Sequence, residues 1–120
     1  MKTIRILLVD DHLVVRRGLC RMLQQEMDME VVGEAANVEE ALIQVDLVSP
    51  DVVLMDIKMP GIDGIEGTRK LKEKCPCCNV LMLTFYEDFG TQAIEAGAAG
   101  LLPKTIKREE LATAIRAANP

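Results

Sequence analysis

Short apolar runs alternate with amphipathic helical patterns five times along the chain, and this alternation constrains the fold more than any other feature. The runs are typical of strands buried on both faces, and they stand at residues 4–9, 31–35, 51–56, 80–84 and 99–102. Helical patterns follow them at residues 12–25, 37–49, 63–74, 88–96 and 109–118. Five such units predict an α/β, flavodoxin-like (βα)5 doubly wound parallel sheet with strand order 2-1-3-4-5.

Length and charge narrow the class of protein. A chain of 120 residues is close to the usual size of one domain, so we expect a single domain over residues 1–120. The net charge of −5 disfavours a nucleic-acid-binding surface, because phosphate backbones are held mainly by Lys and Arg. No apolar run approaches the roughly 20 residues of a membrane span, and the N-terminus lacks a signal-peptide pattern. We therefore expect a cytoplasmic protein without a membrane contact.

Three of the four cysteines lie in the segment Cys75-Pro76-Cys77-Cys78, whose C-x-x-C spacing fits a redox pair or half of a zinc site. A zinc site would need a second pair of ligands, and the only histidine, His12, is far away in the sequence. A thioredoxin-like pair would open a helix after a strand, whereas these cysteines follow a helical pattern and precede a strand. We therefore expect reduced, inert thiols.

Polar side chains stand at the carboxyl ends of four of the five expected strands. They are Asp10, Asp11, Asp56, Thr84 and Lys104. In an open parallel sheet, ligands bind beyond these ends at the switch point, which here lies between the first and third strands. Three carboxylates that converge there would raise one another's pKa unless a cation compensated them, and Mg²⁺ prefers oxygen ligands of this kind. The pattern therefore predicts a magnesium site.

Each of these residues also has an ordinary explanation. Asp10 or Asp11 could cap the first helix, and Asp56 could belong to a turn. Taken singly, Thr84 is a common strand residue and Lys104 a common surface lysine. However, a cap needs only one Asp and leaves Asp56 unexplained. The joint placement of all five residues at strand ends favours a functional site.

Four motifs resemble those of bacterial response-regulator receiver domains, in particular the NarL/LuxR-type subgroup. The motifs are Asp-Asp-His-x-x-Val-Arg-x-Gly-Leu (Asp10 to Leu19), Asp-Val-Val-Leu-Met-Asp-Ile-Lys-Met-Pro-Gly-x-Asp-Gly (Asp51 to Gly64), Leu-Thr (Leu83-Thr84) and Glu-Ala-Gly-Ala-x-Gly-x-Leu-x-Lys (Glu95 to Lys104). The resemblance runs from about Ile4 to Ala118. It treats His12 as a marker of the subgroup that lies outside the reacting set.

The resemblance implies a phosphorylation switch. Asp56 would accept a phosphoryl group from a sensor histidine kinase, and Lys104 and Thr84 would contact that group. Mg²⁺ would be held by Asp10, Asp11, Asp56 and the backbone carbonyl of Lys58. Thr84 would draw its loop inward and so change the face formed by the fourth helix, fifth strand and fifth helix. Such a domain catalyses only its own phosphorylation and dephosphorylation and is otherwise not an enzyme.

The resemblance also implies a homodimer on phosphorylation and a C-terminal helix-turn-helix output domain that binds DNA. The chain stops at Asn119-Pro120, where a linker to such a domain would begin, so we expect that domain to be absent from this chain. A stand-alone receiver in a phosphorelay remains an alternative with the same fold. A small Mg-dependent phosphohydrolase fits poorly, because the haloacid-dehalogenase type needs Asp two residues after the nucleophile, where Lys58 stands.

The sequence departs from the receiver pattern in the region that switches. Leu101 stands where relatives usually carry Tyr or Phe, and the segment after the fourth strand looks shorter than in NarL/LuxR-type relatives. This segment holds every aromatic residue of the chain: Phe85, Tyr86 and Phe89. One of them could replace the missing switch aromatic, or they could merely pack a shortened helix. Pro103 before the lysine is unusual but tolerable on an edge strand.

Overall fold

The computed structural model describes residues 2–85 and 89–120, and the strands in these ranges form one parallel sheet. The strands are β1 (Ile4–Val9), β2 (Met29–Ala35), β3 (Val52–Asp56), β4 (Asn79–Thr84) and β5 (Gly100–Pro103). Their order is β2-β1-β3-β4-β5, and every neighbouring pair is parallel. The strand order predicted from the sequence is confirmed.

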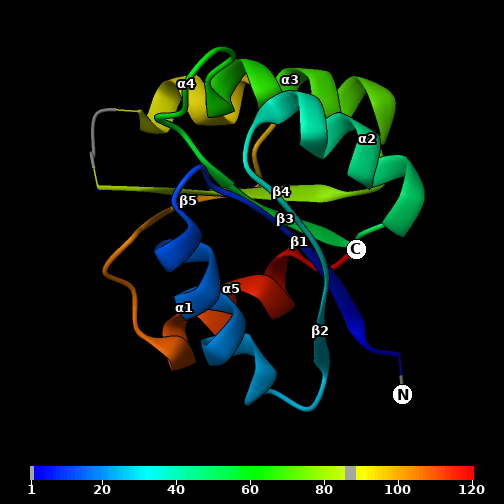
Figure 1. Cartoon of the computed structure of the whole chain (residues 1–120), viewed down its shortest axis with the longest axis vertical. Helices are drawn as coiled ribbons and strands as arrows, with labels where there is room; N and C mark the ends of the chain where they lie inside the picture. The colour runs from blue at the N-terminus through cyan, green and yellow to red at the C-terminus, as the bar shows by residue number, and fades with distance from the viewer. Residues whose placement is uncertain (1, 86–88) are drawn as a thin grey trace.

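Helices cover both faces of the sheet. They are α1 (Leu13–Gln24), α2 (Val38–Val48), α3 (Gly64–Lys74), α4 (Gly90–Glu95) and α5 (Arg108–Ala118). Figure 1 shows α2, α3 and α4 on one face and α1 and α5 on the other. This arrangement is the expected flavodoxin-like doubly wound fold. None of the described helices is long and apolar enough to span a bilayer.

The hydrophobic core consists of two clusters, one on each face of the sheet. One cluster joins the sheet to α2, α3 and α4, and the other joins it to α1 and α5. Strand β3 lies in the middle of the sheet, and all five of its residues are buried, including the polar Asp56 at its end. Burial on both faces explains why this strand reads as a continuous apolar run.

Local sequence signals set the ends of several helices. The Asn37 side chain accepts a hydrogen bond from the Glu40 backbone N–H (2.8 Å), which confirms the expected cap of α2. The Glu40 carboxylate accepts from the Ala36 N–H (3.3 Å), one residue earlier than the predicted capping box requires. Asp63 caps α3 in the same way through the Glu66 N–H (3.0 Å). Gly97, after α4, has φ of +103°, the expected left-handed conformation.

Several boundaries differ from the sequence prediction by one or two residues. Strand β2 begins at Met29, two residues earlier than expected, because Met29 pairs with Ile4 at the start of β1. Strand β5 extends to Pro103, which an edge strand accommodates since its outer side needs no ladder hydrogen bond. The expected start of α4 at Asp88 lies outside the described residues, and the described helix begins at Gly90.

Candidate functional site

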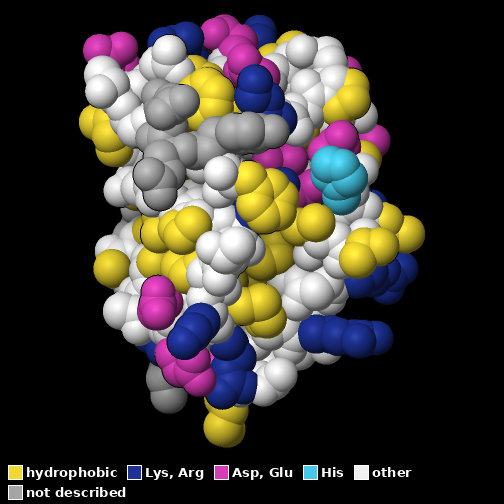
Figure 2. Space-filling view, turned by 90° about the vertical axis from the view of Figure 1, so that its left-hand side faces the viewer, with side chains coloured by type: hydrophobic (Ala, Val, Ile, Leu, Met, Phe, Trp, Pro, Cys, Tyr) yellow, Lys and Arg dark blue, Asp and Glu magenta, His cyan; other side chains and the backbone are white. Residues whose placement is uncertain are grey.

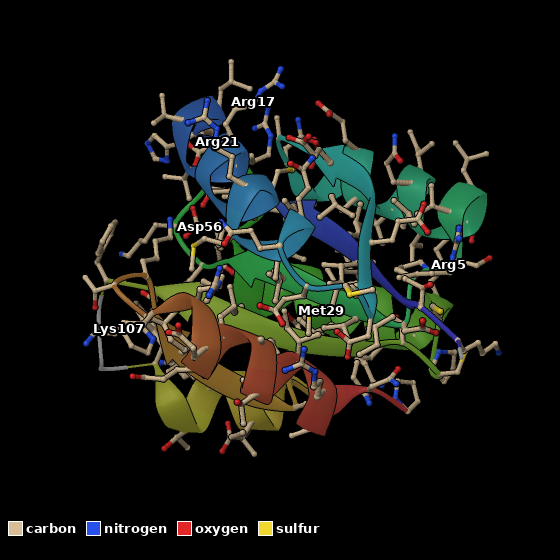
Figure 3. The ribbon with its side chains drawn as sticks, turned by 90° about the horizontal axis from the view of Figure 1, so that it is seen from below. Arg5, Arg17, Arg21, Met29, Asp56 and Lys107 are labelled. Atoms are coloured by element: carbon tan, nitrogen blue, oxygen red, sulfur yellow. The ribbon has the colours of Figure 1, made fainter. Side chains whose placement is uncertain are left out.

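The carboxyl ends of β1 and β3 bring three aspartates together. Val9 of β1 pairs with Met55 of β3, so the residues that follow them come side by side. Ligand atoms of Asp10, Asp11, Asp56 and His12 all lie within 4.8 Å of one another. Figure 3 shows Asp56 at the end of the sheet opposite to Arg5, and Figure 2 shows the histidine beside acidic side chains on this edge.

Lys104 follows the edge strand β5, and its side chain extends to this cluster. Its Nζ lies 3.0 Å from Asp10 Oδ2 and 2.9 Å from Asp56 Oδ1, and only 6% of its side chain is exposed. Strand β4 separates β5 from β3, so the lysine extends past the end of β4. There its backbone N–H donates to the Thr84 carbonyl (2.9 Å), and Thr84 itself is buried. One ammonium group therefore joins two carboxylates from different strands.

The two oxygens of Asp56 have different surroundings. Oδ1 pairs with Lys104, whereas Oδ2 is buried and has no hydrogen-bond partner among the described residues. A buried carboxylate oxygen without a partner is unfavourable, because desolvation is not compensated. Asp11 Oδ1 is also buried without a hydrogen bond in the described part, although His12 Nδ1 lies 3.1 Å from it. Both oxygens are placed to bind a cation.

Burial shifts the pKa values of Asp56 and Lys104, and the ion pair between the two side chains opposes both of these shifts. Burial raises the pKa of Asp56; Lys104 opposes this shift, and the Asp10 and Asp11 carboxylates add to it. For Lys104, burial alone would lower the pKa, but hydrogen bonds to Asp56 and Asp10 outweigh it and leave the pKa raised. Lys104 therefore stays cationic, while the three carboxylates carry more negative charge than this lysine neutralises.

Residues 6–116 match the response regulator receiver domain family. The chain belongs to this family. It is 47% identical over 115 residues to response regulator GacA of Pseudomonas protegens, covering 94% of this chain and 54% of that protein. It is 44% identical over 118 residues to transcriptional regulatory protein LiaR of Bacillus subtilis, covering 97% and 56%. The chain thus spans about half the length of the curated relatives it matches.

Solved structures agree with this assignment. The receiver domain matches a LuxR-family two-component response regulator from an Aurantimonas species with a TM-score of 0.91 and 39% identity, over 97% of this chain and 84% of that one. It matches the receiver domain of the putative response regulator NarL from Mycobacterium tuberculosis with a TM-score of 0.92 and 32% identity, over 98% of both chains. The flavodoxin-like fold and the NarL/LuxR-type resemblance are confirmed.

One neighbour of Asp10 in the receiver domain, Arg16, had no role assigned from the sequence. Arg16 of α1 donates from Nη1 to the Asp10 carbonyl (2.5 Å) and from Nε to Glu34 Oε1 of β2 (3.1 Å). The His12 backbone N–H donates to Asp10 Oδ1 (2.9 Å), but the N-cap of α1 is His12 and it has no side-chain cap hydrogen bond, so neither aspartate caps the helix. Arg16 stands in the Asp-Asp-His motif, but its partners depend on how α1 packs against β2.

The loop after Asp56 is held close to the start of α3. The Gly64 N–H donates to the Ile57 carbonyl (2.8 Å), and a side chain at Gly64 would overlap the backbone oxygen of Asp56. Lys58, whose backbone carbonyl is an expected metal ligand, follows Ile57 in this loop and is exposed. Its Nζ lies 5.4 Å from the centre of the Phe89 ring. Glycine at position 64 therefore lets α3 begin directly against the end of β3.

The two described aromatic residues, Phe85 and Phe89, lie beside Lys104 and Lys58 rather than at the position of Leu101, which is half-buried. The Phe85 ring centre is 5.3 Å from Lys104 Nζ, and Phe85 is 66% exposed. A hollow of about 350 Å³ lies beside it and includes Thr84, Leu101 and Lys104 in its lining. Tyr86 lies outside the described residues. Which aromatic, if any, replaces the switch residue stays a prediction.

Proposed function

We propose that this receiver domain accepts a phosphoryl group on Asp56 in a reaction that requires Mg²⁺. The observation that carries the proposal is the pair of Asp56 oxygens. One is paired with Lys104 at 2.9 Å, and the other is buried without a hydrogen-bond partner among the described residues. A buried carboxylate with one oxygen unpaired in the described part can act as a nucleophile. The ammonium group beside it can stabilise the negative charge of an incoming phosphoryl group.

The donor set fits a magnesium ion. Carboxylate oxygens of Asp10, Asp11 and Asp56 lie close together, and Mg²⁺ binds through one or two carboxylates with further oxygen ligands and waters. The Lys58 carbonyl is the fourth ligand that we propose. The excess negative charge of the cluster also favours a divalent cation, because Lys104 alone does not balance it. When bound, magnesium supplies electrostatic stabilisation of the charge on the transferring group.

The chain's own residues then perform the transfer. An Asp56 carboxylate oxygen attacks the phosphorus of a phosphohistidine in a sensor kinase; the P–N bond breaks and an acyl phosphate forms. Lys104, already beside Asp56 Oδ1, pairs with an oxygen of the new phosphoryl group. The Thr84 hydroxyl donates to the same group and favours the inward conformation of its loop, which changes the face formed by α4, β5 and α5.

This switch would control transcription through a second domain. LiaR is named a transcriptional regulatory protein, and the receiver covers 56% of its length. We infer a C-terminal helix-turn-helix domain that binds DNA, a phosphorylation-dependent homodimer and a cytoplasmic location. A stand-alone receiver in a phosphorelay is the alternative, and the presence or absence of a downstream coding region would separate the two.

Mass measurement after treatment with acetyl phosphate tests the acceptor. We expect wild type with Mg²⁺ to gain one phosphoryl group, located on the peptide that contains Asp56. Asp56→Asn should gain none, whereas Asp46→Asn, which changes an exposed aspartate in the last turn of α2, should behave as wild type. Labelling of Asp56→Asn at the wild-type level would place the acceptor elsewhere and end the proposal.

Magnesium titration tests the metal site separately. We expect Asp11→Ala to weaken Mg²⁺ binding at least tenfold, in the range seen when a ligand or its support is lost. Binding should also weaken as the pH falls through the carboxylate range, because protonated ligands do not coordinate. Equal affinities of wild type and Asp11→Ala would rule out the proposed ligand set even if Asp56 is phosphorylated.

A further inference from the structure

The cysteine cluster lies at the edge of the sheet opposite to the phosphorylation site. Cys75 ends α3, where its N–H donates to the Leu71 carbonyl (2.7 Å), and Cys78 directly precedes β4. The Sγ atoms of Cys75 and Cys77 are 3.8 Å apart. Cys77 is exposed and Cys75 is half-buried. The proposed phosphorylation uses none of these residues.

The two cysteines of the C-x-x-C spacing noted in the sequence, Cys75 and Cys78, differ in their exposure. Cys78 is buried, and its thiol donates to the Cys75 carbonyl (3.2 Å). Burial, with a smaller effect of Cys75, raises the pKa of Cys78 to about 12. Cys20 in α1 is half-buried, and burial together with Glu34 raises its pKa as well. Both thiols are therefore protonated and poorly nucleophilic at neutral pH.

We propose that Cys75 and Cys77 are a dithiol site that a hydroperoxide oxidises to a reversible intramolecular disulfide. Their sulfur atoms must approach from 3.8 Å to the roughly 2.05 Å of an S–S bond, a change that rotation of the exposed Cys77 side chain can supply. Both residues also line an open hollow of about 510 Å³, so an oxidant can reach them. The sequence alone favoured inert thiols; the separation and exposure favour this modification.

The chemistry balances in two steps. The Cys77 thiolate attacks the terminal oxygen of the hydroperoxide, and the O–O bond breaks. The leaving group departs as an alcohol or water, and Cys77 becomes a sulfenic acid. The Cys75 thiolate then attacks that sulfur, the S–O bond breaks and water leaves. Two thiols lose two electrons and two protons, and the hydroperoxide is reduced. A low-molecular-weight dithiol reverses the reaction.

Two lysines hold the turn that carries the pair. Lys72 Nζ donates to the carbonyls of Pro76 and Cys78, each at 2.8 Å, and so fixes a positive charge on the backbone of this turn. Lys74 lines the same hollow as Cys75 and Cys77. Its Nζ also pairs with Asp46 Oδ2 (2.9 Å), so both lysines fix the position of the turn in which Cys75 and Cys77 lie side by side.

The site is connected to the C-terminal end of α5. The Asn79 side chain, next to Cys78, donates to the Ala118 carbonyl (2.7 Å), and Pro120 lines the hollow with the two cysteines. Asn79 is the first residue of β4 and directly follows the turn that a disulfide would restrain. We therefore expect oxidation to change amide hydrogen exchange at the end of α5 and not at the phosphorylation site.

Peptide mass mapping of the full chain after hydrogen peroxide treatment, without reductant, tests the proposal. We expect the peptide with Cys75 and Cys77 to lose two hydrogen atoms and to recover them with dithiothreitol. Cys75→Ser should abolish this bridge and leave a sulfenic acid on Cys77 that a dimedone probe traps. Cys20→Ser, the matched control in α1, should keep the rate of bridging within about twofold of wild type.

Other outcomes would overturn the site. A bridge to Cys78 or Cys20, or only intermolecular disulfides, would show that the 3.8 Å separation does not determine reactivity. The proposal also fails if Cys75 and Cys77 are still reduced at peroxide concentrations that fully oxidise free cysteine in the same solution. Circular dichroism of each variant checks that the fold is retained.

Discussion

The two edges of the sheet hold ion pairs of the same chemistry and length in opposite environments. At the carboxyl edge, Lys104 contacts Asp56 at 2.9 Å, with side chains 6% and 4% exposed. At the amino edge, Lys74 contacts Asp46 at the same 2.9 Å, with side chains 39% and 62% exposed. Distance alone therefore does not distinguish the two pairs, whereas access to water does.

The difference shows where the fold tolerates an unfavourable arrangement. An exposed pair gains little and loses little when one partner is removed, because water solvates the other. A buried pair depends on both partners, because the remaining charge has no solvent. At the carboxyl edge, Lys104 contacts Asp10 and Asp56, and the carboxylate of Asp11 lies close to both aspartates. Packing of the hydrophobic core alone does not require three carboxylates around one lysine. The cluster is thus explained by the phosphorylation chemistry proposed for it.

Removing the buried lysine should produce the largest effect. Lys104→Met leaves Asp10 and Asp56 buried without their shared cation, and we expect the free energy of unfolding to fall by roughly 2–4 kcal/mol. Urea unfolding in metal-free buffer measures the change. Lys74→Met at the amino edge is the matched control and should change stability by less than about 1 kcal/mol. Equal losses would show that burial does not separate the two edges.

Backbone crowding gives a second, smaller contrast. Gly64→Ala at the carboxyl edge places a methyl group against the Asp56 carbonyl, and we expect a loss of about 1–3 kcal/mol together with slower phosphorylation. Gly18→Ala in α1 meets nothing within 4 Å and should instead stabilise the domain by about 0.5–1 kcal/mol. Thermal unfolding of both variants tests this. A neutral Gly64→Ala would mean that α3 can shift away from β3.

Much of the carboxyl edge could be predicted from the sequence, because strand ends in a parallel sheet converge. Asp10, Asp11 and Asp56 were expected at one edge, and the structure brings their carboxylates together. The convergence of strand ends also predicted that Lys104 lies at this edge. The sequence did not show that its single ammonium group contacts both Asp10 and Asp56, because that depends on how the side chain passes the end of β4.

Contacts made across elements were the part that sequence reasoning missed. Arg16 binds the Asp10 carbonyl and Glu34 only because α1 lies against β2 at a particular rotation. Likewise, the spacing in the sequence pointed to Cys75 with Cys78, whereas the C-terminal turn of α3 buries Cys78 and leaves Cys77 beside Cys75. Periodicity predicts which face of a helix is buried, but it does not select the partner of each polar group.

Neutralising the phosphoacceptor should stabilise the fold modestly. Burial raises the pKa of Asp56, so its ionised form is disfavoured in the native state. Stability from a raised pKa is present below the ordinary carboxyl value and is lost as the pH rises through the native one. We therefore expect Asp56→Asn to be more stable than wild type at pH 7, by on the order of 1 kcal/mol. The advantage should disappear below about pH 4.

Magnesium provides the control for that prediction. Because the ion would compensate the carboxylates, it should stabilise wild type more than Asp56→Asn and so narrow the difference at pH 7. Thermal unfolding with and without Mg²⁺ measures both effects. If Asp56→Asn is less stable than wild type in metal-free buffer at neutral pH, the ionised carboxylate is favoured in the fold and the charge argument is wrong.

The smallest expected effect lies in an exposed group at the amino edge, where the pH dependence has the opposite sign. The Arg116 guanidinium binds Asp28 (2.8 Å) and holds the pKa of that carboxyl below its usual value. A lowered pKa contributes stability above the ordinary carboxyl value and loses it as the pH falls through the native one. Arg116→Gln should therefore be slightly less stable than wild type at pH 7 and equal to it in strong acid. Urea unfolding across this range tests whether the half-buried Asp28 and the buried Asp56 respond to pH in opposite directions. A stability difference that grew toward low pH would contradict the lowered pKa of Asp28.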